Sequence, residues 1–432
     1  LRGLAQLLAG QDASGVGGIS FGGQMHGLVA LDGSDNVIRP AILWNDGRTE
    51  EETQYLNEVI GKEKLSAWTG NIAFAGFTAP KLLWMKKHEP ENFAKIAKIM
   101  LPKDYLAYRL SGAFSTDFSD ASGMLLLDVK NRRWSREMCD VCGISEQMLP
   151  QLHESYEVVG TLRQEIAGKF GLKDVKIIAG AGDNAAAAVG TGVVGEGGCN
   201  ISLGTSGTLF VSSASYKEDK VNALHSFCHA DGGWHLMGCI LSAASCNSWW
   251  VNGILQSTDY KKEEAGLDEF LGKNDVYFLP YLMGERSPHN DVTARGAFIG
   301  MRPDTTRGMM TLAMLEGVTF ALRDCLEAAK KNGAVIPRTK LCGGGAKSKL
   351  WRKIVANVMN LPVDIPQTEQ GPGFGAAMLA MVGCGEYQTV QEAADAIVRV
   401  KETVLPDSDI AAQYEERYRH FTKLYPALKG LF

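Results

Sequence analysis

The sequence lacks a strong charge of either sign. Lys and Arg together number 44, and Asp and Glu number 49, so the formal net charge is −5 over 432 residues. A chain with this balance has no overall electrostatic attraction for nucleic acid or for an anionic membrane surface. Any phosphate group that the protein handles must therefore be held by local groups.

Long hydrophobic runs are also missing, and no signal or transit peptide is visible. The longest stretch without Asp, Glu, Lys or Arg spans residues 232–258. Only about half of its residues are apolar, and Gly, Ser, Asn and Gln interrupt it throughout. We expect a buried strand followed by a core helix there, and no membrane span.

Cysteine occurs without a pairing pattern. The nine cysteines are odd in number and scattered, so no disulfide framework is predicted. Cys139-x-x-Cys142 could be half of a zinc site or a redox motif, but no second pair completes it, and we interpret both as ordinary thiols near a surface turn. His225, His229 and His235 also lack a completing ligand and are interpreted as core or loop histidines. A reducing, cytoplasmic setting fits this pattern.

No G-x-x-x-x-G-K-[ST] phosphate loop occurs, and no repeat of 20–50 residues is visible. These absences exclude a P-loop nucleotide-binding protein and a repeat architecture. Of all residues in the sequence, 45% are apolar and 22% are charged, a composition typical of soluble globular proteins. The length favours two domains over one.

In the first half, short apolar runs alternate with helical patterns, which is typical of α/β proteins. The predicted elements are strands at 19–21, 28–31 and 175–179 and helices at 54–60, at 81–87 and from 185 onward. A glycine-rich turn is predicted at residues 22–27, and another turn at residues 180–184. Five glycines between residues 190 and 198 mark the best domain boundary.

The second half opens with a strand, a tight turn and a second strand. Residues 200–203 and 208–212 flank Gly204-Thr205-Ser206-Gly207, which predicts a hairpin. A long helix is predicted over 305–331. Residues 341–342 lead into a run of glycines at 343–345, and Ser348 is predicted to cap a helix with one apolar face.

The three glycine turns, at residues 22–23, 204–207 and 343–345, follow predicted strands. Glycine lets backbone N–H groups approach an anion closely, and the N-terminus of a following helix adds partial positive charge. A glycine after a strand is more often simply a turn, so each one alone is weak evidence of a phosphate site.

Asp183 lies just beyond an apolar strand, where open α/β sheets bind their ligands. It could act as a general base, or Asp183 or Asn184 could be the N-cap of the following helix. Gln24, Met25 and His26 follow the first glycine turn. They could fill the turn, with Met25 in the core, or they could bind a polyhydroxylated ligand, because neutral hydroxyls need several directional partners.

Taken together, these motifs resemble the FGGY family of carbohydrate kinases. Residues 76–84, Gly-Phe-Thr-Ala-Pro-Lys-Leu-Leu-Trp, match the first family signature, and residues 296–301 and 313–316 match most of the second. Met309 departs from the pattern, which has a polar or acidic residue there. The other motifs that carry the resemblance are residues 23–27, 44–48, 101–106, 182–186 and 284–289, and they are most similar to those of members that phosphorylate D-xylulose. The resemblance covers nearly the whole chain.

The resemblance implies an α/β fold of two actin-like (ribonuclease-H-like) ATPase domains around a cleft. Residues 1–195 would form the sugar-binding domain, and residues 196–432 the nucleotide-binding domain. The implied reaction converts D-xylulose to D-xylulose 5-phosphate with ATP and Mg²⁺, without nucleic-acid or membrane partners. The alternative is a kinase of another ketose, a sugar acid or a polyol. Homodimers are common among such kinases, so a second copy of the chain is a candidate partner.

The resemblance also assigns roles to residues. The sugar would be bound by Gln24, Met25, His26 and Asn184 together with Asp183, which would be the general base on the terminal hydroxyl. The ATP-binding residues would be Gly204, Thr205, Ser206 and Gly207 in the phosphate hairpin and Gly343, Gly344, Gly345 and Ala346 on the adenosine side. No residue is assigned as a ligand of Mg²⁺.

Family members open with a strand that carries an Asp-x-Gly-Thr turn, their other phosphate loop. No such turn occurs in the sequence, and residues 31–34, Leu-Asp-Gly-Ser, come too late and differ too much to replace it. We therefore expect the N-terminal domain to lack its first strands. A chain that truly begins at Leu1 is expected to bind sugar with weak or no kinase activity and to expose a sheet edge.

Overall fold

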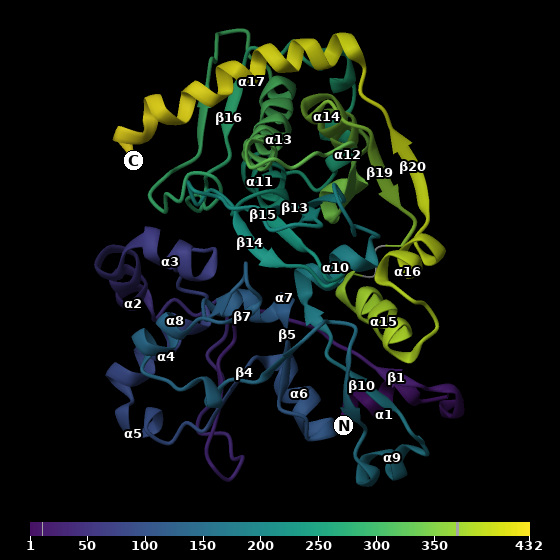
Figure 1. Cartoon of the computed structure of the whole chain (residues 1–432). Helices are drawn as coiled ribbons and strands as arrows, with labels where there is room; N and C mark the ends of the chain where they lie inside the picture. The colour runs from purple at the N-terminus through teal and green to yellow at the C-terminus, as the bar shows by residue number, and fades with distance from the viewer. Residues whose placement is uncertain (11, 369–370) are drawn as a thin grey trace.

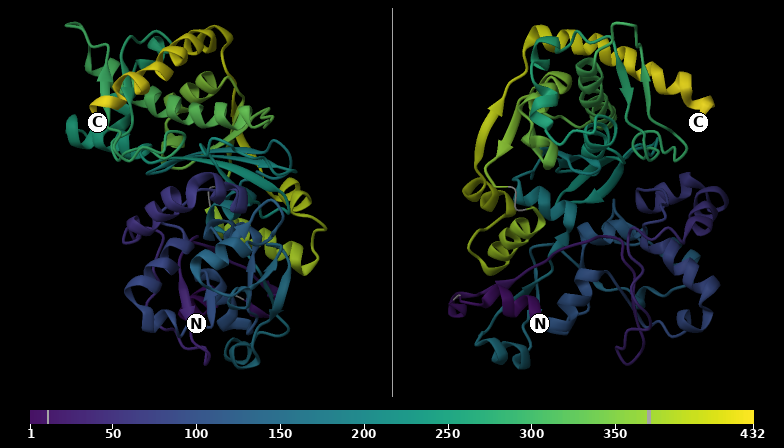
Figure 2. Two further views of the ribbon diagram at one scale, coloured as in Figure 1. Left: turned by 60° about the vertical axis from the view of Figure 1, so that its left-hand side comes forward. Right: turned by 180° about the vertical axis from the view of Figure 1, so that it is seen from behind.

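The computed structural model describes residues 1–10, 12–368 and 371–432. Figure 1 shows two bodies, one below the other, with the first half of the chain in the lower body and a large sheet with its helices in the upper one. This two-domain α/β arrangement confirms the predicted fold class. In both views of Figure 2 the sheet of the second half lies between its own helices and the first half.

The first half contains ten α-helices and eleven short strands within the described residues. The helices are α1 (Arg2–Leu8), α2 (Glu50–Gln54), α3 (Lys62–Thr69), α4 (Thr78–His88), α5 (Pro90–Phe93), α6 (Pro102–Ser111), α7 (Phe118–Ala121), α8 (Arg136–Cys142), α9 (Gln164–Phe170) and α10 (Asp183–Gly190). The strands are β1 (Gly18–Ile19), β2 (Gly22–Gly23), β3 (Val29–Leu31), β4 (Lys98–Met100), β5 (Ser115–Asp117), β6 (Leu127–Asp128), β7 (Arg133–Trp134), β8 (Gln151–His153), β9 (Val158–Thr161), β10 (Lys176–Ile178) and β11 (Ala181–Gly182).

Two parallel pairings set the geometry of this half. β1 pairs with β10, and β2 pairs with β11 in the register Gly22↔Ala181. Segments far apart in the sequence thus run side by side and end together. Of the turn predicted at residues 22–27, Gly22 and Gly23 form β2 instead, and the chain bends after them at Met25 and His26. The two residues of β2 are glycines for close packing: a Cβ on Gly23 would come 2.5 Å from the Cβ of Lys103.

The second half is built on a seven-stranded sheet in the order β14-β15-β13-β12-β18-β19-β20. Its strands are β12 (Cys199–Leu203), β13 (Gly207–Ser213), β14 (His225–Cys228), β15 (Trp234–Ile240), β18 (Thr339–Cys342), β19 (Val363–Pro366) and β20 (Val400–Val404); β16 (Tyr277–Leu279) and β17 (Ala297–Ile299) pair separately. The helices are α11 (Ala244–Ser248), α12 (Tyr260–Glu264), α13 (Arg307–Lys331), α14 (Lys349–Met359), α15 (Gly371–Cys384), α16 (Val390–Ile397) and α17 (Ser408–Leu428).

Several predictions for this half are confirmed. β12 and β13 form the predicted hairpin, with Leu203 opposite Gly207. α13 is the predicted long helix, and Ser348 caps α14 by accepting a hydrogen bond from the backbone N–H of Trp351 at 3.0 Å. The uncharged stretch 232–258 contains β15 and α11, as expected. Among the described helices, none has the length and apolar character needed to cross a membrane.

The structure shows where the cysteines and histidines discussed above lie. No disulfide bond joins the cysteines. Cys139 and Cys142 are buried in α8, which ends at the exposed turn residue Gly143, and burial raises the pKa of Cys142 to about 12. The three histidines are buried, as expected for core residues. One of them, His229, donates from Nε2 to the carbonyl oxygen of Val193 at 2.9 Å.

The two halves are joined first by a pair of helices. α15 comes from the second half but packs against α10 and against β1 and β10 of the first, as Figure 1 shows. The contact is close enough that a Cβ on Gly375 would overlap the carbonyl oxygen of Ala186. The shared core includes Ala185, Val189 and Leu379.

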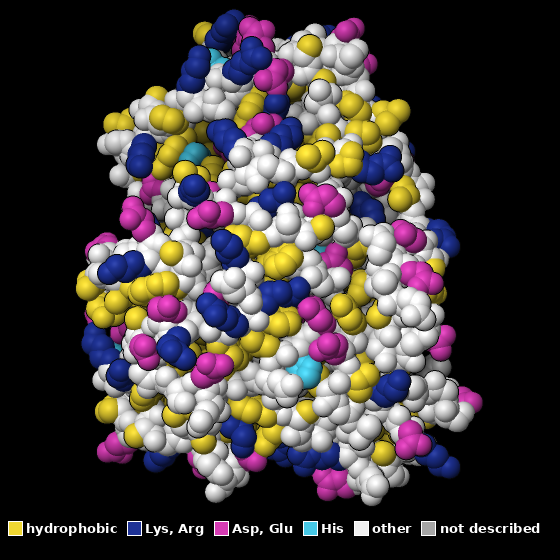
Figure 3. All heavy atoms as spheres, viewed as in Figure 1, with side chains coloured by type: hydrophobic (Ala, Val, Ile, Leu, Met, Phe, Trp, Pro, Cys, Tyr) yellow, Lys and Arg dark blue, Asp and Glu magenta, His cyan; other side chains and the backbone are white. Residues whose placement is uncertain are grey.

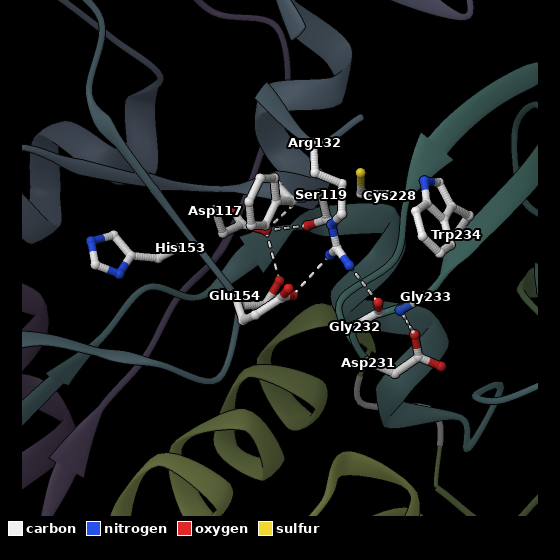
Figure 4. Close-up of polar contacts among 12 residues, drawn as sticks. Asp117, Ser119, Arg132, His153, Glu154, Cys228, Asp231, Gly232, Gly233 and Trp234 are labelled. Atoms are coloured by element: carbon white, nitrogen blue, oxygen red, sulfur yellow. Dashed lines mark hydrogen bonds and ion pairs between the residues drawn. The ribbon is translucent and has the colours of Figure 1, made fainter. Parts of the chain in front are cut away.

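A second junction lies at the β14–β15 hairpin. The Arg132 guanidinium donates to the carbonyl oxygen of Gly232 at 2.6 Å and to Glu154 at 2.9 Å, as Figure 4 shows. It also lies over the ring of Trp234, 5.1 Å from the centroid. Trp234 in turn donates from Nε1 to the carbonyl oxygen of Val129 at 2.9 Å. On the face in Figure 3, basic and acidic side chains are interspersed, in keeping with the nearly balanced charge.

The substitution Gly375→Ala is expected to lower the free energy of unfolding by about 1–3 kcal/mol, since overpacking a close contact carries this cost. Urea unfolding measures the change. The matched control is Gly373→Ala in the same helix, where an added Cβ meets no atom within 4 Å. It should be neutral or stabilising by up to about 1 kcal/mol through helix propensity. Equal effects of the two variants would contradict the helix contact.

Candidate active site

The loop after β2 holds His26 in a defined orientation. His26 has a positive φ of 71°, and its carbonyl oxygen accepts hydrogen bonds from Lys81 Nζ at 2.8 Å and Thr78 Oγ1 at 3.1 Å. Its ring Nδ1 lies 2.7 Å from the carbonyl oxygen of Gly123. Because a carbonyl oxygen only accepts, Nδ1 carries the proton and Nε2 presents a lone pair. Burial lowers the pKa of His26 to about 3, so the ring is neutral at neutral pH.

Met25 links this loop to the strand end before Asp183. Its side chain is only 5% exposed. A Cβ on Gly182 would lie 2.9 Å from Met25 Cγ, and one on Gly123 would lie 3.0 Å from Met25 Cε. Met25 therefore packs against the residue preceding Asp183 and, together with the His26 ring, against Gly123. Gln24 lies on the same loop and is exposed.

Asp183 is the first residue of α10, and the N-cap of that helix is Gly182 with no side-chain cap. The interpretation of Asp183 or Asn184 as the N-cap is therefore wrong, because both already lie in the helix. The Oδ1 atom of Asp183 accepts from the backbone N–H of Asn184 at 2.8 Å. Burial outweighs this bond and raises the pKa of Asp183, which makes the carboxylate a stronger base.

A buried polar network supports this strand end, and the sequence analysis missed it. Lys103 Nζ lies 2.8 Å from Asp117 and 3.7 Å from Asp120. Asp117 accepts from the hydroxyl of Ser119, as Figure 4 shows, and Ser119 Oγ accepts from the backbone N–H of Gly182 at 3.1 Å. The network thus fixes the backbone next to Asp183. The available signal was the run Thr-Asp-Phe-Ser-Asp at 116–120, which is unusually polar for a buried segment.

The two nucleotide turns predicted in the second half also meet. β12 and β18 are parallel neighbours, with Ser202 opposite Cys342, so the turns that follow them lie at one sheet edge. Gly343 has a φ of 87°, and a Cβ there would come 2.7 Å from the backbone of Leu203 and 3.0 Å from the nitrogen of Gly204. Only glycine permits this approach.

The residues of these turns differ in accessibility. Thr205, Ser206 and Gly344 are exposed and available to a ligand, whereas Gly207 and Gly345 are buried. The Ala346 side chain is fully buried in the core, so only its backbone can contribute to the turn. Two hydrogen bonds hold the hairpin turn in place. The carbonyl oxygen of Thr205 accepts from the backbone N–H of Ala243 at 3.0 Å and from Ser245 Oγ at 2.7 Å.

One group of three candidate metal ligands occurs in the part of the chain that the structure describes: Glu51, Glu52 and His88. It lies on α2 and α4 and contains none of the predicted site residues. The ammonium group of Lys87 lies 2.5 Å from Glu51 and 3.9 Å from Glu52, so a side-chain cation already faces these carboxylates.

The known proteins that are similar to this chain, as given below, are all sugar kinases. Residues 2–190 match the N-terminal domain and residues 199–384 the C-terminal domain of the FGGY family of carbohydrate kinases. The chain is 40% identical to a xylulose kinase from Escherichia coli (strain K12) over 425 residues, covering 98% of this chain and 86% of that protein. Its structure is similar to that of a xyloylose kinase from Brucella ovis, with a TM-score of 0.94, 40% identity and coverage of 100% and 88%. A gluconate kinase from Lactobacillus acidophilus gives a TM-score of 0.92 at 26% identity, with coverage of 98% and 86%.

Lys81 makes the free energy of unfolding of the protein depend on pH. Its ammonium group is fully buried, and it donates to the carbonyl oxygens of His26 at 2.8 Å and Gly76 at 2.6 Å. Burial lowers the pKa of Lys81 from 10.5 to about 7. Between these values the unfolded chain binds more protons than the folded chain, so the free energy of unfolding contributed by Lys81 rises with pH across this interval.

In the variant Lys81→Met, the free energy of unfolding should no longer rise with pH in this way, because the variant removes the titrating group. Urea unfolding at pH 7 and at pH 9 measures the change for each protein. The control Lys64→Met, which alters an exposed lysine of α3, should keep the wild-type pH dependence. A rise in Lys81→Met equal to that of the wild type would contradict the assignment.

Proposed function

The chain belongs to the FGGY family of carbohydrate kinases, and on that basis we propose that it transfers the γ-phosphoryl group of ATP to the 5-hydroxyl of D-xylulose. The observation that carries this proposal is the packing of Met25, the neighbour of His26, against Gly182, the residue before Asp183, where the paired strands β2 and β11 end. The names of the relatives support D-xylulose as the sugar.

The chemistry of the convergent groups suits a neutral, polyhydroxylated substrate. The neutral imidazole of His26 offers Nε2 as an acceptor for a sugar hydroxyl, and Asn184 offers an amide. Met25 supplies an apolar surface beside them. Neutral hydroxyls are recognised by such directional partners and need no opposite charge. The exposed Gln24 would complete the set from the same loop.

In the proposed reaction, Asp183 accepts the proton of the sugar hydroxyl while the hydroxyl oxygen attacks the γ-phosphorus. The bond from phosphorus to the β–γ bridging oxygen breaks, and its electron pair leaves with ADP. The products are the sugar phosphate, ADP and a proton on Asp183, which is later released to water. Such a transfer depends mainly on positioning and on charge stabilisation.

The nucleotide is assigned to the second half, residues 196–432, and the sugar to residues 1–195. ATP is proposed to enter as its Mg²⁺ complex, whose cation neutralises phosphate charge. The exposed hairpin at 204–207 would hold the phosphates with its backbone and hydroxyls, and the turn at 343–346 would face the adenosine. A cytoplasmic location and a homodimer are further parts of the proposal.

The substrate is tested by a coupled assay of ADP release with D-xylulose, L-ribulose, glycerol and gluconate. D-xylulose should give the highest kcat/KM. A thermal melt with each sugar runs beside the assay, because bound ligand raises the melting temperature. A higher kcat/KM for another sugar would contradict the assignment of D-xylulose. If D-xylulose raises the melting temperature but is not turned over, the result would support the sugar site and contradict kinase activity of this chain.

The role of Asp183 is tested by Asp183→Asn. The turnover number should fall by about 10²–10⁴-fold, the contribution of a general base. The melting temperature should stay the same or rise, since the variant removes a buried carboxylate. The control is Asp174→Asn, at an exposed position with a φ of 50° that asparagine tolerates. Unchanged turnover in Asp183→Asn would contradict its role.

A further inference from the structure

Arg286 extends from the second half of the chain toward the sugar residues of the first half. Its guanidinium lies over the ring of Phe74, 5.2 Å from the centroid. Phe74 contacts Phe77 edge-on at 5.5 Å, and Phe77 stacks on His26 at 4.7 Å. Two aromatic rings thus connect the guanidinium to the predicted sugar-binding histidine.

The backbone of Arg286 is held firmly beside the end of β15. The carboxyl group of Glu285 accepts from the backbone N–H of Leu241 at 3.1 Å and from that of Arg286 at 2.7 Å. The backbone N–H of Ser287 donates to the carbonyl oxygen of Cys239 at 3.0 Å. These bonds fix the point from which the long side chain extends.

This anchor lies close to the proposed phosphate hairpin. Ile240, the last residue of β15, lies between the two anchoring residues Cys239 and Leu241 and is the register partner of Gly207. The Arg286 segment is therefore separated from the hairpin strand β13 by β15, at a spacing of about 10 Å for two strand intervals. Arg286 thus lies between the residues assigned to the phosphates and those assigned to the sugar.

Apart from the Phe74 ring, the charge of Arg286 has no ion-pair or hydrogen-bond partner within the described ranges. No carboxylate lies within ion-pair distance of its guanidinium there, and no hydrogen-bond acceptor is in reach. The adjacent Glu285 is buried, and burial raises its pKa to about 8, so at neutral pH it is mostly uncharged. The positive charge of Arg286 helps to lower the pKa of both His26 and His225, which places it near both rings.

A half-buried guanidinium without a carboxylate partner is suited to an anionic ligand, because its fork of N–H donors matches phosphate oxygens. We propose that Arg286 binds the phosphoryl group as it passes to the sugar hydroxyl and, afterwards, the phosphate of the sugar phosphate product. Arg286 remains protonated throughout and forms no covalent bond. This inference rests on the proposed function.

The test compares the binding of D-xylulose and D-xylulose 5-phosphate by calorimetry in the wild type and in Arg286→Gln. The variant should bind the sugar phosphate about 10–100-fold more weakly, the effect of losing a charge-assisted hydrogen bond. Its affinity for D-xylulose should change by less than about threefold, since the sugar lacks the phosphate that the guanidinium binds. The control is Arg302→Gln, an exposed arginine whose closest partner is Asp275 at 3.5 Å, and it should match the wild type.

The kinetic counterpart is a fall in kcat of about 10²–10³-fold, as for other donors to a transition-state oxyanion, with little change in KM for D-xylulose. A thermal melt confirms that the variant folds. If Arg286→Gln melts early, Arg286→Lys serves instead, because it keeps the charge and loses the planar fork. It should show an intermediate loss of affinity for the sugar phosphate.

The outcomes separate this inference from the proposed function. Wild-type turnover of D-xylulose with equal sugar-phosphate affinity in Arg286→Gln would overturn the role of Arg286 and leave the kinase proposal intact. An equal loss for sugar and sugar phosphate would also overturn it, because the contact would then be to the sugar. A wild-type protein that binds neither ligand would overturn both.

Discussion

The close approach of two parallel strand pairs is the constraint on which the site depends. β1 and β2 run beside β10 and β11, and the loop with His26 and the helix with Asp183 begin where these strands end. The approach leaves no room for side chains: a Cβ on Gly182 would press on Met25, and one on Gly123 would overlap the His26 ring. Glycine is needed here for the absence of a side chain, and the spaces it leaves are filled by Met25 and His26.

Burial then sets the charge of each group at the site. The same cause keeps the His26 ring neutral, raises the pKa of Asp183 and lowers the pKa of Lys81 to about 7. It also favours the uncharged form of Glu285, whose pKa is raised to about 8. His26 and Glu285 are therefore mostly uncharged at neutral pH, whereas Asp183 is the proposed carboxylate base and the guanidinium of Arg286 is a cation. This division suits a neutral sugar that acquires a phosphate.

Local patterns in the sequence predicted local structure well. The β12–β13 hairpin, α13 and the Ser348 cap each depend on residues near one another in the chain, and all three are confirmed. β2 was missed because its partner β11 is remote in sequence, and only that pairing turns two glycines into a strand.

The buried charges could not be predicted for a related reason. Lysines in helical patterns are normally exposed, but Lys81 and Lys103 are buried because distant carbonyl and carboxyl groups surround their ammonium ions. Asp183, Met25 and His26 could be identified as candidates from residue type and position after a strand. The packing of Met25 against the residue before Asp183 could not be predicted, because it depends on how the distant strands β2 and β11 are paired.

The proposed base, Asp183, is held in position by contacts with both halves of the molecule. Asp183 lies in the first half of the chain, yet it opens α10, and the remaining turns of that helix pack on α15 from the second half. The contact is close between backbones, at Gly375 and Ala186, so the two helices cannot shift against each other without opening a cavity or a clash. The position of the carboxylate is thereby tied to both halves: the bond from Gly182 to Ser119 holds it to the first, and the contact of α10 with α15 holds it to the half that carries the proposed phosphate hairpin. Under the proposed function, the helix pair that joins the two bodies would thereby align the base, the sugar and the phosphate for transfer.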